Sequence, residues 1–160
     1  MAHKDERGTV SAVGLAVLTV ILLLGLAAAA FMRNGADLAV EYEREMQLRL
    51  AAESAVETAA AKLERDANAY GVPPARNQRK RITEEVLKEN VPVGADIELH
   101  VVLEGSDARE PENVLKVTAA AIDKSGMRIP DGENWERAKI VRARMEKKEK
   151  DNRYVWQRWY

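Results

Sequence analysis

The feature that most constrains this chain is residues 9–32, an apolar run that contains no charged side chain. As a helix rising ~1.5 Å per residue, it would be about 36 Å long, whereas the hydrocarbon core of a bilayer is about 30 Å thick. An ordinary signal peptide has a shorter apolar region of roughly 7 to 15 residues, although the four alanines at residues 27–30 could supply its Ala-x-Ala cleavage site. We therefore interpret residues 9–32 as a membrane-spanning helix.

The short charged segment that precedes this run contains Lys4 and Arg7. Positively charged residues tend to stay on the cytoplasmic side of a membrane. We therefore expect a single-pass protein of the inner or cytoplasmic membrane, with its N-terminus in the cytoplasm.

The rest of the chain, about 125 residues, is enough for one small domain. The 25 basic and 26 acidic residues of the full sequence nearly balance, so no overall field favours nucleic acid or an anionic surface. Cysteine is absent, and the two histidines, His3 and His100, have no metal-ligand spacing around them. The sequence also lacks phosphate-loop, dinucleotide and nucleophile-elbow motifs. We expect no enzyme activity, no cofactor and no metal site.

Residues 37–70 are rich in helix-forming residues, and their apolar positions recur every three or four residues. These positions are Leu38, Tyr42, Met46, Ala52, Val56, Ala59, Leu63, Ala67 and Tyr70. Because no proline separates this segment from residues 9–32, we predict one continuous helix of about 60 residues, ~90 Å long. Gly71, Pro73 and Pro74 should end it.

Residues 71–160 change period and predict a small globular part. A loop should lead to a short helix over residues 83–89, followed by strands over 97–104, 114–122, 139–146 and 153–160. Short connections between strands favour an antiparallel meander. A sheet with one apolar face must cover it, and the stripe on residues 37–70 is the large apolar surface available. The fold class is therefore α+β, with a long N-terminal helix packed on a small antiparallel sheet.

Two groups of residues in the globular part are candidate surfaces for a partner. Arg76, Arg79, Lys80 and Arg81 could contact the phosphates of a polyanion such as DNA, although a solvated loop is the simpler interpretation. Trp156 and Trp159 are three residues apart, so on a regular strand they point to opposite faces and cannot both face the core. One of them could cover a partner subunit, while core packing is the alternative.

The N-terminal half of the chain resembles the type IV pilin and type II secretion pseudopilin superfamily. Arg7 and Gly8 at the start of the apolar run resemble the signal that prepilin peptidase cuts after glycine, here between Gly8 and Thr9. Two further segments, LGLAA at residues 24–28 and LRLAAESA at residues 48–55, resemble the minor pilins of the PilX type. The resemblance covers about the first 65 residues.

The resemblance implies a specific organisation of the chain. Residues 1–8 would be the prepilin leader, 9–32 the transmembrane and filament-core helix, 33–70 its amphipathic continuation, and 71–160 the globular part. The protein would be a structural subunit that helps to prime or cap a pilus or a secretion filament outside the cell. Its partners would be prepilin peptidase, the membrane and other pilin subunits. The alternatives are an unprocessed membrane-anchored envelope scaffold and a DNA-contacting subunit of a competence pilus.

Val13 departs from the superfamily pattern. If Thr9 is the first mature residue, Val13 is the fifth, where most pilins carry a glutamate that compensates the N-terminal amine of a neighbouring subunit. An unpaired charge in an apolar filament core is costly. Minor subunits of the PilX and GspK types also tend to lack this glutamate, and those of the GspK type are placed at the filament tip.

Overall fold

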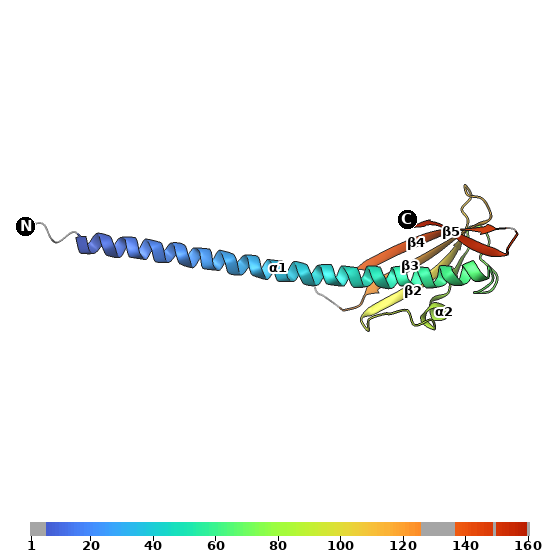
Figure 1. The fold of residues 1–160 in the computed structure, drawn as a ribbon, viewed down its shortest axis with the longest axis horizontal. Coiled ribbons are helices and arrows are strands. Elements are labelled where there is room, and N and C mark those ends of the chain that lie inside the picture. The colour runs from blue at the N-terminus through green and yellow to red at the C-terminus, as the bar shows by residue number, and fades with distance from the viewer. Residues whose placement is uncertain (1–5, 126–136, 149, 160) are drawn as a thin grey trace, which may run out of the picture. The chain divides into compact units, whose positions relative to one another are not determined.

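The structure, a computed structural model, describes residues 6–125, 137–148 and 150–159, with side chains from residue 13 onward. Its helices are α1 (Glu6–Arg65) and α2 (Thr83–Leu87). Its strands are β1 (Arg79–Arg81), β2 (Ile97–Gly105), β3 (Val114–Asp123), β4 (Ala138–Lys148) and β5 (Arg153–Trp159) (Figure 1). The expected α+β fold, a long N-terminal helix packed on an antiparallel sheet, is confirmed.

The chain divides into two compact units, Met1–Glu43 and Arg44–Tyr160. The boundary lies within α1, which is continuous over 60 residues as predicted. In its described part the first unit is helical, and the second unit contains the remainder of α1 together with the sheet.

The sheet is a simple meander in which each strand pairs antiparallel with the next, in the order β1-β2-β3-β4-β5. The strands expected over residues 97–104, 114–122 and 139–146 are confirmed to within two residues. The last expected strand corresponds to β5, and residue 160 lies outside the described residues. The short helix is two residues shorter than expected.

The core of the second unit lies between α1 and one face of the sheet. Alternate residues of β2 are buried, and their partners on β3 continue the same face, as in the pairs Leu99–Ala121 and Val101–Ala119. The side chains that α1 contributes are mostly small: Leu48, Ala51, Ala52, Ala55, Val56, Ala59, Ala60 and Leu63. Because alanine is short, the helix can lie close to the sheet, and close packing maximises dispersion contacts.

Burial of the α1 stripe starts later than its period suggested. Leu38 and Tyr42, in the first unit, are 66% and 67% exposed, and the buried positions begin at Leu48. A period identifies the apolar side of a helix but does not show which turns face another element. The buried part of the stripe therefore begins at Leu48, and its first two members, Leu38 and Tyr42, are exposed.

The end of α1 also differs from the prediction. The helix stops at Arg65, before the glycine and prolines that were expected to end it. The carboxylate of Asp66 accepts a hydrogen bond from the backbone N–H of Asn68 at 3.0 Å, a local turn that competes with the helix. Ala67 donates its own backbone N–H to Asn152 at 3.0 Å. Ala67 and Tyr70 are nevertheless buried, as the stripe predicted.

An ion pair joins α1 to the end of β3 within the second unit. The Arg44 guanidinium contacts both carboxylate oxygens of Asp123, with Nε–Oδ2 at 2.9 Å and Nη2–Oδ1 at 2.5 Å. The Asp123 side chain is only 4% exposed. Hydrogen bonds from Arg44, and to a lesser extent from Ser125, hold the pKa of Asp123 well below its usual range. The pair therefore stays ionised and fixes the helix to the sheet.

Candidate interaction surfaces

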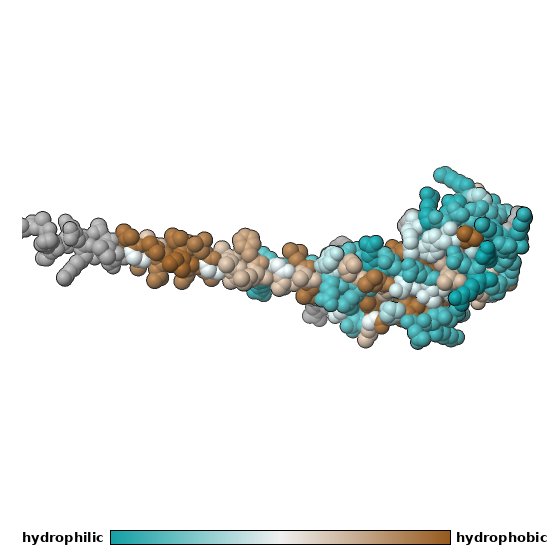
Figure 2. Space-filling model, viewed as in Figure 1, coloured by the Kyte–Doolittle hydropathy of each residue, from teal (hydrophilic) through white to brown (hydrophobic). Residues whose placement is uncertain are grey.

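The apolar part of the first unit is fully exposed. Among the described residues, α1 is the one helix long and apolar enough to cross a membrane, and none of its most apolar 18-residue window is buried. Figure 2 shows this stretch as a run of hydrophobic side chains along α1. Its exposed apolar side chains include Leu15, Leu18, Ile21, Leu22, Leu23, Leu24 and Leu26. Such a surface needs an apolar environment, because soluble proteins rarely expose large apolar patches.

The residues expected at the processing site lie near the start of α1. The helix begins at Glu6, so Gly8 and Thr9 are helical, and their side chains lie outside the described ones. Val13 is 63% exposed. Thr19 donates its hydroxyl to the carbonyl of Leu15 at 2.8 Å, so its polar group is satisfied within the helix.

The basic cluster is not a loop as favoured from the sequence, because three of its four residues form the edge strand β1. Arg79, Lys80 and Arg81 pair with Glu104, Leu103 and Val102 of β2. Neighbouring residues of a strand point to opposite faces, so Lys80 is separated from the other two. A strand of three charged residues has no apolar alternation, which is why the sequence pattern missed it.

Arg76 binds the backbone of the loop between β2 and β3. Its Nε donates to the carbonyl of Asp107 at 3.0 Å, and its Nη2 donates to the carbonyls of Ala108 and Glu110 at 2.5 and 3.0 Å. These carbonyls belong to a turn-rich segment that would otherwise rely on water for partners. Arg76 therefore stabilises this loop.

The cations of β1 also have partners within the protein. Lys80 donates its ammonium group to the carbonyl of Tyr70, at the turn that follows α1. Arg79 pairs with Glu104, its neighbour across the strands, with Nε–Oε1 at 2.8 Å. Arg81 is exposed. The structure therefore does not present these residues as a single free basic patch.

Both described tryptophans lie on the same face of β5, which overturns the assumption of a regular strand. Trp156 pairs with Met145 and Trp159 pairs with Ala143, because the register shifts between Arg144 and Met145. A β-bulge of this kind changes which residues share a face. The two indole rings contact each other edge to face, with their centroids 4.6 Å apart and an interplanar angle of 69°.

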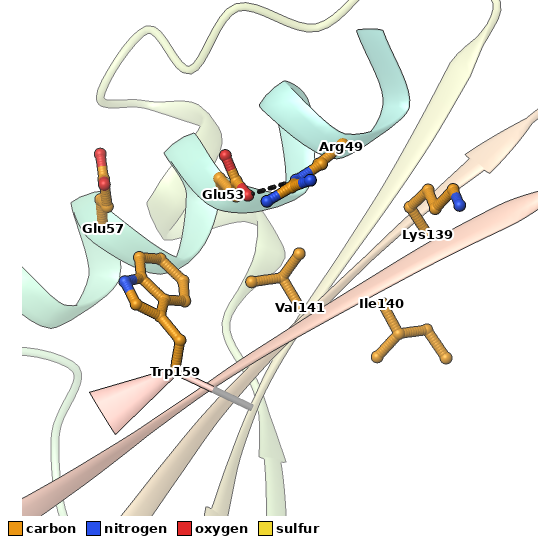
Figure 3. A pocket seen from close by; sticks show the side chains of 7 residues that line it. All are labelled: Arg49, Glu53, Glu57, Lys139, Ile140, Val141 and Trp159. Carbon is orange, nitrogen blue, oxygen red and sulfur yellow. Dashed lines mark hydrogen bonds and ion pairs between the residues drawn. The ribbon is translucent and has the colours of Figure 1, made fainter. Parts of the chain in front are cut away.

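These tryptophans border an open groove between α1 and strands β4 and β5. One part, of about 560 Å³, is lined by Arg49, Glu53, Glu57, Lys139, Ile140, Val141 and Trp159 (Figure 3). The adjoining part, of about 320 Å³, is lined by Glu57, Ala60, Ala61, Glu64, Trp156 and Trp159. We call the two parts together the tryptophan groove. The sequence pointed to the two tryptophans as a candidate surface, but no sequence pattern indicated that residues of α1 and β4 line the same groove.

The charges of the groove differ along its length. At one end Arg49 and Glu53 form an ion pair at 2.7 Å, and Lys139 contacts Glu45. Hydrogen bonding to Lys139 lowers the pKa of Glu45, so this carboxylate stays ionised. The end beside the tryptophans contains two carboxylates, Glu57 and Glu64.

Within the described part of the chain, no three histidine, aspartate or glutamate side chains converge on a potential metal site. His100 lies on the outer face of β2, where its Nε2 is 2.9 Å from a carboxylate oxygen of Glu98. Comparison of the chain with protein-family models, with curated proteins and with solved structures found no match.

Proposed function

We propose that the protein is a minor pilin or pseudopilin of the PilX type. In this proposal prepilin peptidase cuts after Gly8, and the mature subunit passes from the inner or cytoplasmic membrane into an extracellular filament. There it helps to prime or cap a type IV pilus or a type II secretion-like filament by helix packing and sheet contacts.

The observation that carries the proposal is Arg7–Gly8 at the start of an exposed apolar helix that continues, without interruption, onto an antiparallel sheet. One continuous helix that is apolar in its first part and packed on a sheet in its second part suits a subunit that assembles through that helix. The fully exposed apolar stretch of the first unit supports a role in which lipid, and later other subunits, surround it.

Val13 supports a place at the end of a filament over a place in its shaft. A shaft subunit without a carboxylate at this position would leave the N-terminal amine of its neighbour unpaired in an apolar core. The first subunit of a filament has an open side, so it has no neighbour there to compensate.

The basic cluster does not favour a nucleic-acid role. Arg76 and Lys80 donate to backbone carbonyls, and Arg79 pairs with Glu104. A polyanion would have to compete with these contacts. We therefore assign the cluster to the stability of the globular part.

Sequencing of the mature N-terminus tests the proposal. When the full chain is produced together with a prepilin peptidase, we expect a protein that begins at Thr9. The variant Gly8→Leu should remain uncut, and Gly14→Ala, in the same helix, should be cut normally. An uncut chain that begins at Met1 would instead indicate a membrane-anchored scaffold, and a start near Phe31 would indicate a domain released by signal peptidase.

The variant Val13→Glu tests the position in the filament. If the protein primes or caps the filament, the new carboxylate should increase its incorporation into the shaft, measured by immunogold labelling along isolated filaments. Val13→Gln, which adds a polar group without charge, is the matched control. Equal labelling of the shaft by the wild type and by Val13→Glu would contradict a place at the end.

A further inference from the structure

The tryptophan groove lies entirely within the second unit, and its walls come from distant parts of the chain. Trp159 points from β5 toward the turn of α1 that carries Glu57 (Figure 3). It is 41% exposed, and Trp156 beside it is half-buried. Exposed tryptophan beside a concave surface is the composition typical of a docking site, because indole rings bury much area at low entropic cost.

The charge of the groove beside the tryptophans favours a cationic ligand. Among the described residues that line this part, the charged side chains are Glu57 and Glu64, and lysine and arginine are absent. One turn before Glu57, the pairing of Glu53 with Arg49 partly neutralises the opposite end. The two carboxylates can attract a positive group by ion pairing, and the two indole rings that line the same part can bind it by cation–π interaction.

The edge of β5 disfavours docking by strand addition. The backbone N–H of Trp156, in the middle of this edge strand, donates to Oε1 of Glu64 at 3.3 Å. An incoming strand would have to displace this side chain before it could form a ladder of hydrogen bonds. A ligand that contacts the groove through its side chains does not meet this obstacle.

The spacing of the two carboxylates indicates that the ligand is a helix. Glu57 and Glu64 are seven residues apart on α1, so they lie on the same side of the helix about 10.5 Å apart along its axis. Residues i and i+7 of a second helix aligned with the groove have the same spacing. Ala61 lies between the two carboxylates, is exposed and has a small side chain, so a second helix can approach closely at this position.

The described part of this chain does not supply that helix. The basic residues of α1 are Arg7, Arg33, Arg44, Arg49, Lys62 and Arg65, and no two of them are seven residues apart. A second copy that used α1 would therefore place at most one cation against the two carboxylates.

We infer that the tryptophan groove docks an amphipathic helix of a different protein, which carries two basic residues seven positions apart. These residues pair with Glu57 and Glu64, and the side chains between them pack on Trp156 and Trp159. Arginine fits better than lysine at both positions, because its planar guanidinium can stack on indole while it binds a carboxylate. This inference does not depend on whether the protein enters a filament.

Three alanine-rich helical peptides test the inference. The first carries arginine at positions i and i+7, the second carries neutral citrulline at the same positions, and the third carries arginine at i and i+5. Each is titrated into the full chain, labelled with ¹⁵N at tryptophan and held in nonionic detergent, while the indole N–H signals of Trp156 and Trp159 are followed. Replacement of each tryptophan by phenylalanine assigns the signals.

The first peptide should shift both signals to saturation. The citrulline peptide, which loses both ion pairs, should bind about tenfold more weakly, and the i+5 peptide, which loses one of them, about threefold more weakly. Glu57→Gln and Glu64→Gln should each weaken binding about threefold. Glu53→Gln, whose carboxylate is already paired with Arg49, is the matched control and should bind as the wild type does. These glutamates are on the exposed or half-exposed side of α1, so all three variants should remain folded.

Trp159→Leu should weaken binding about tenfold, as expected for an aromatic anchor of an interface. Several results would overturn the inference: equal binding of the arginine and citrulline peptides, equal binding of the i+7 and i+5 peptides, or unshifted indole signals at millimolar peptide. Tighter binding of an extended peptide with the same two arginines would show that the groove binds a strand and not a helix, and this result would also overturn the inference.

Discussion

The two edge strands of the sheet carry the two residue clusters that the sequence made conspicuous, and the clusters differ in what they contact. Beside β1, the cations of the basic cluster are directed at the protein itself, as when Arg76 donates to three loop carbonyls. Beside β5, Trp159 remains partly exposed over a groove. A run of like charges can therefore bind backbone carbonyls of its own protein and leave no open binding surface. The open surface beside β5 is instead formed by residues that are distant in the sequence, such as Glu64 and Trp156, which are separated by 92 positions.

The largest effect is expected at Gly105, where the loop before β1 lies against the end of β2. A Cβ at Gly105 would be 2.1 Å from the carbonyl oxygen of Ala75. Gly105→Ala should therefore lower the free energy of unfolding by about 3 kcal/mol or more, because the backbone must move. Denaturant titration of the full chain in detergent, followed by circular dichroism, measures this loss.

Gly94→Ala is the matched control for Gly105→Ala. A Cβ at Gly94 meets no atom closer than 3.7 Å, an ordinary van der Waals contact with Ile97. Its free energy of unfolding should stay within about 0.5 kcal/mol of the wild type. If the two variants are equally stable, the loop before β1 is not packed tightly against Gly105. The conclusion that the β1 edge of the sheet mainly stabilises the fold would then be contradicted.

A smaller loss is expected when the ion pair of Arg44 and Asp123 is broken. Asp123→Asn removes the charge that compensates a half-buried guanidinium and should cost about 2 to 3 kcal/mol. Arg49→Gln, which breaks the exposed pair with Glu53, is the control and should cost less than about 1 kcal/mol. Similar losses in both variants would show that the buried pair is no stronger than a surface pair.

The same ion pair predicts a dependence of stability on pH. The pKa of Asp123 is lowered in the folded state, so its contribution is complete above the pKa of the unfolded carboxyl, about 3.9, and is lost as the pH falls below that value. Between pH 6 and pH 3 the wild type should lose more stability than Asp123→Asn. Denaturant titrations at both pH values test this, and parallel losses in the two proteins would contradict it.

Arg76 should contribute about 1 to 2 kcal/mol through its hydrogen bonds to the loop carbonyls. Arg76→Ala should lower the free energy of unfolding by this amount, and Arg81→Ala, which removes an exposed charge, should change it by about 0.5 kcal/mol or less. In filter binding with double-stranded DNA, Arg76→Ala should behave as the wild type does. A large loss of DNA binding with unchanged stability would reverse our assignment of the basic cluster.

The structural features that could be predicted from the sequence are those encoded by residues close together in the chain. The alternation in β2 and the period of α1 are local, and they predicted the strand, the helix and the packing of one on the other. The bulge that brings Trp156 and Trp159 to one face has no glycine or proline to mark it, so it could not be predicted. The groove depends on that bulge and on the distance between α1 and β5, which only the folded chain determines.

The smallest effect on stability is expected at Trp159, and it decides between core packing and an open surface. Because this side chain is 41% exposed, Trp159→Leu should lower the free energy of unfolding by about 1 kcal/mol or less. Tyr154, on the same strand, is only 6% exposed, so Tyr154→Leu should cost clearly more and serves as the core control. Equal losses would place Trp159 in the core, and the two edges of the sheet would then both serve stability. If Trp159→Leu instead lowers the free energy of unfolding only slightly but weakens peptide binding, then the β1 edge stabilises the fold and the β5 edge is available to bind a partner.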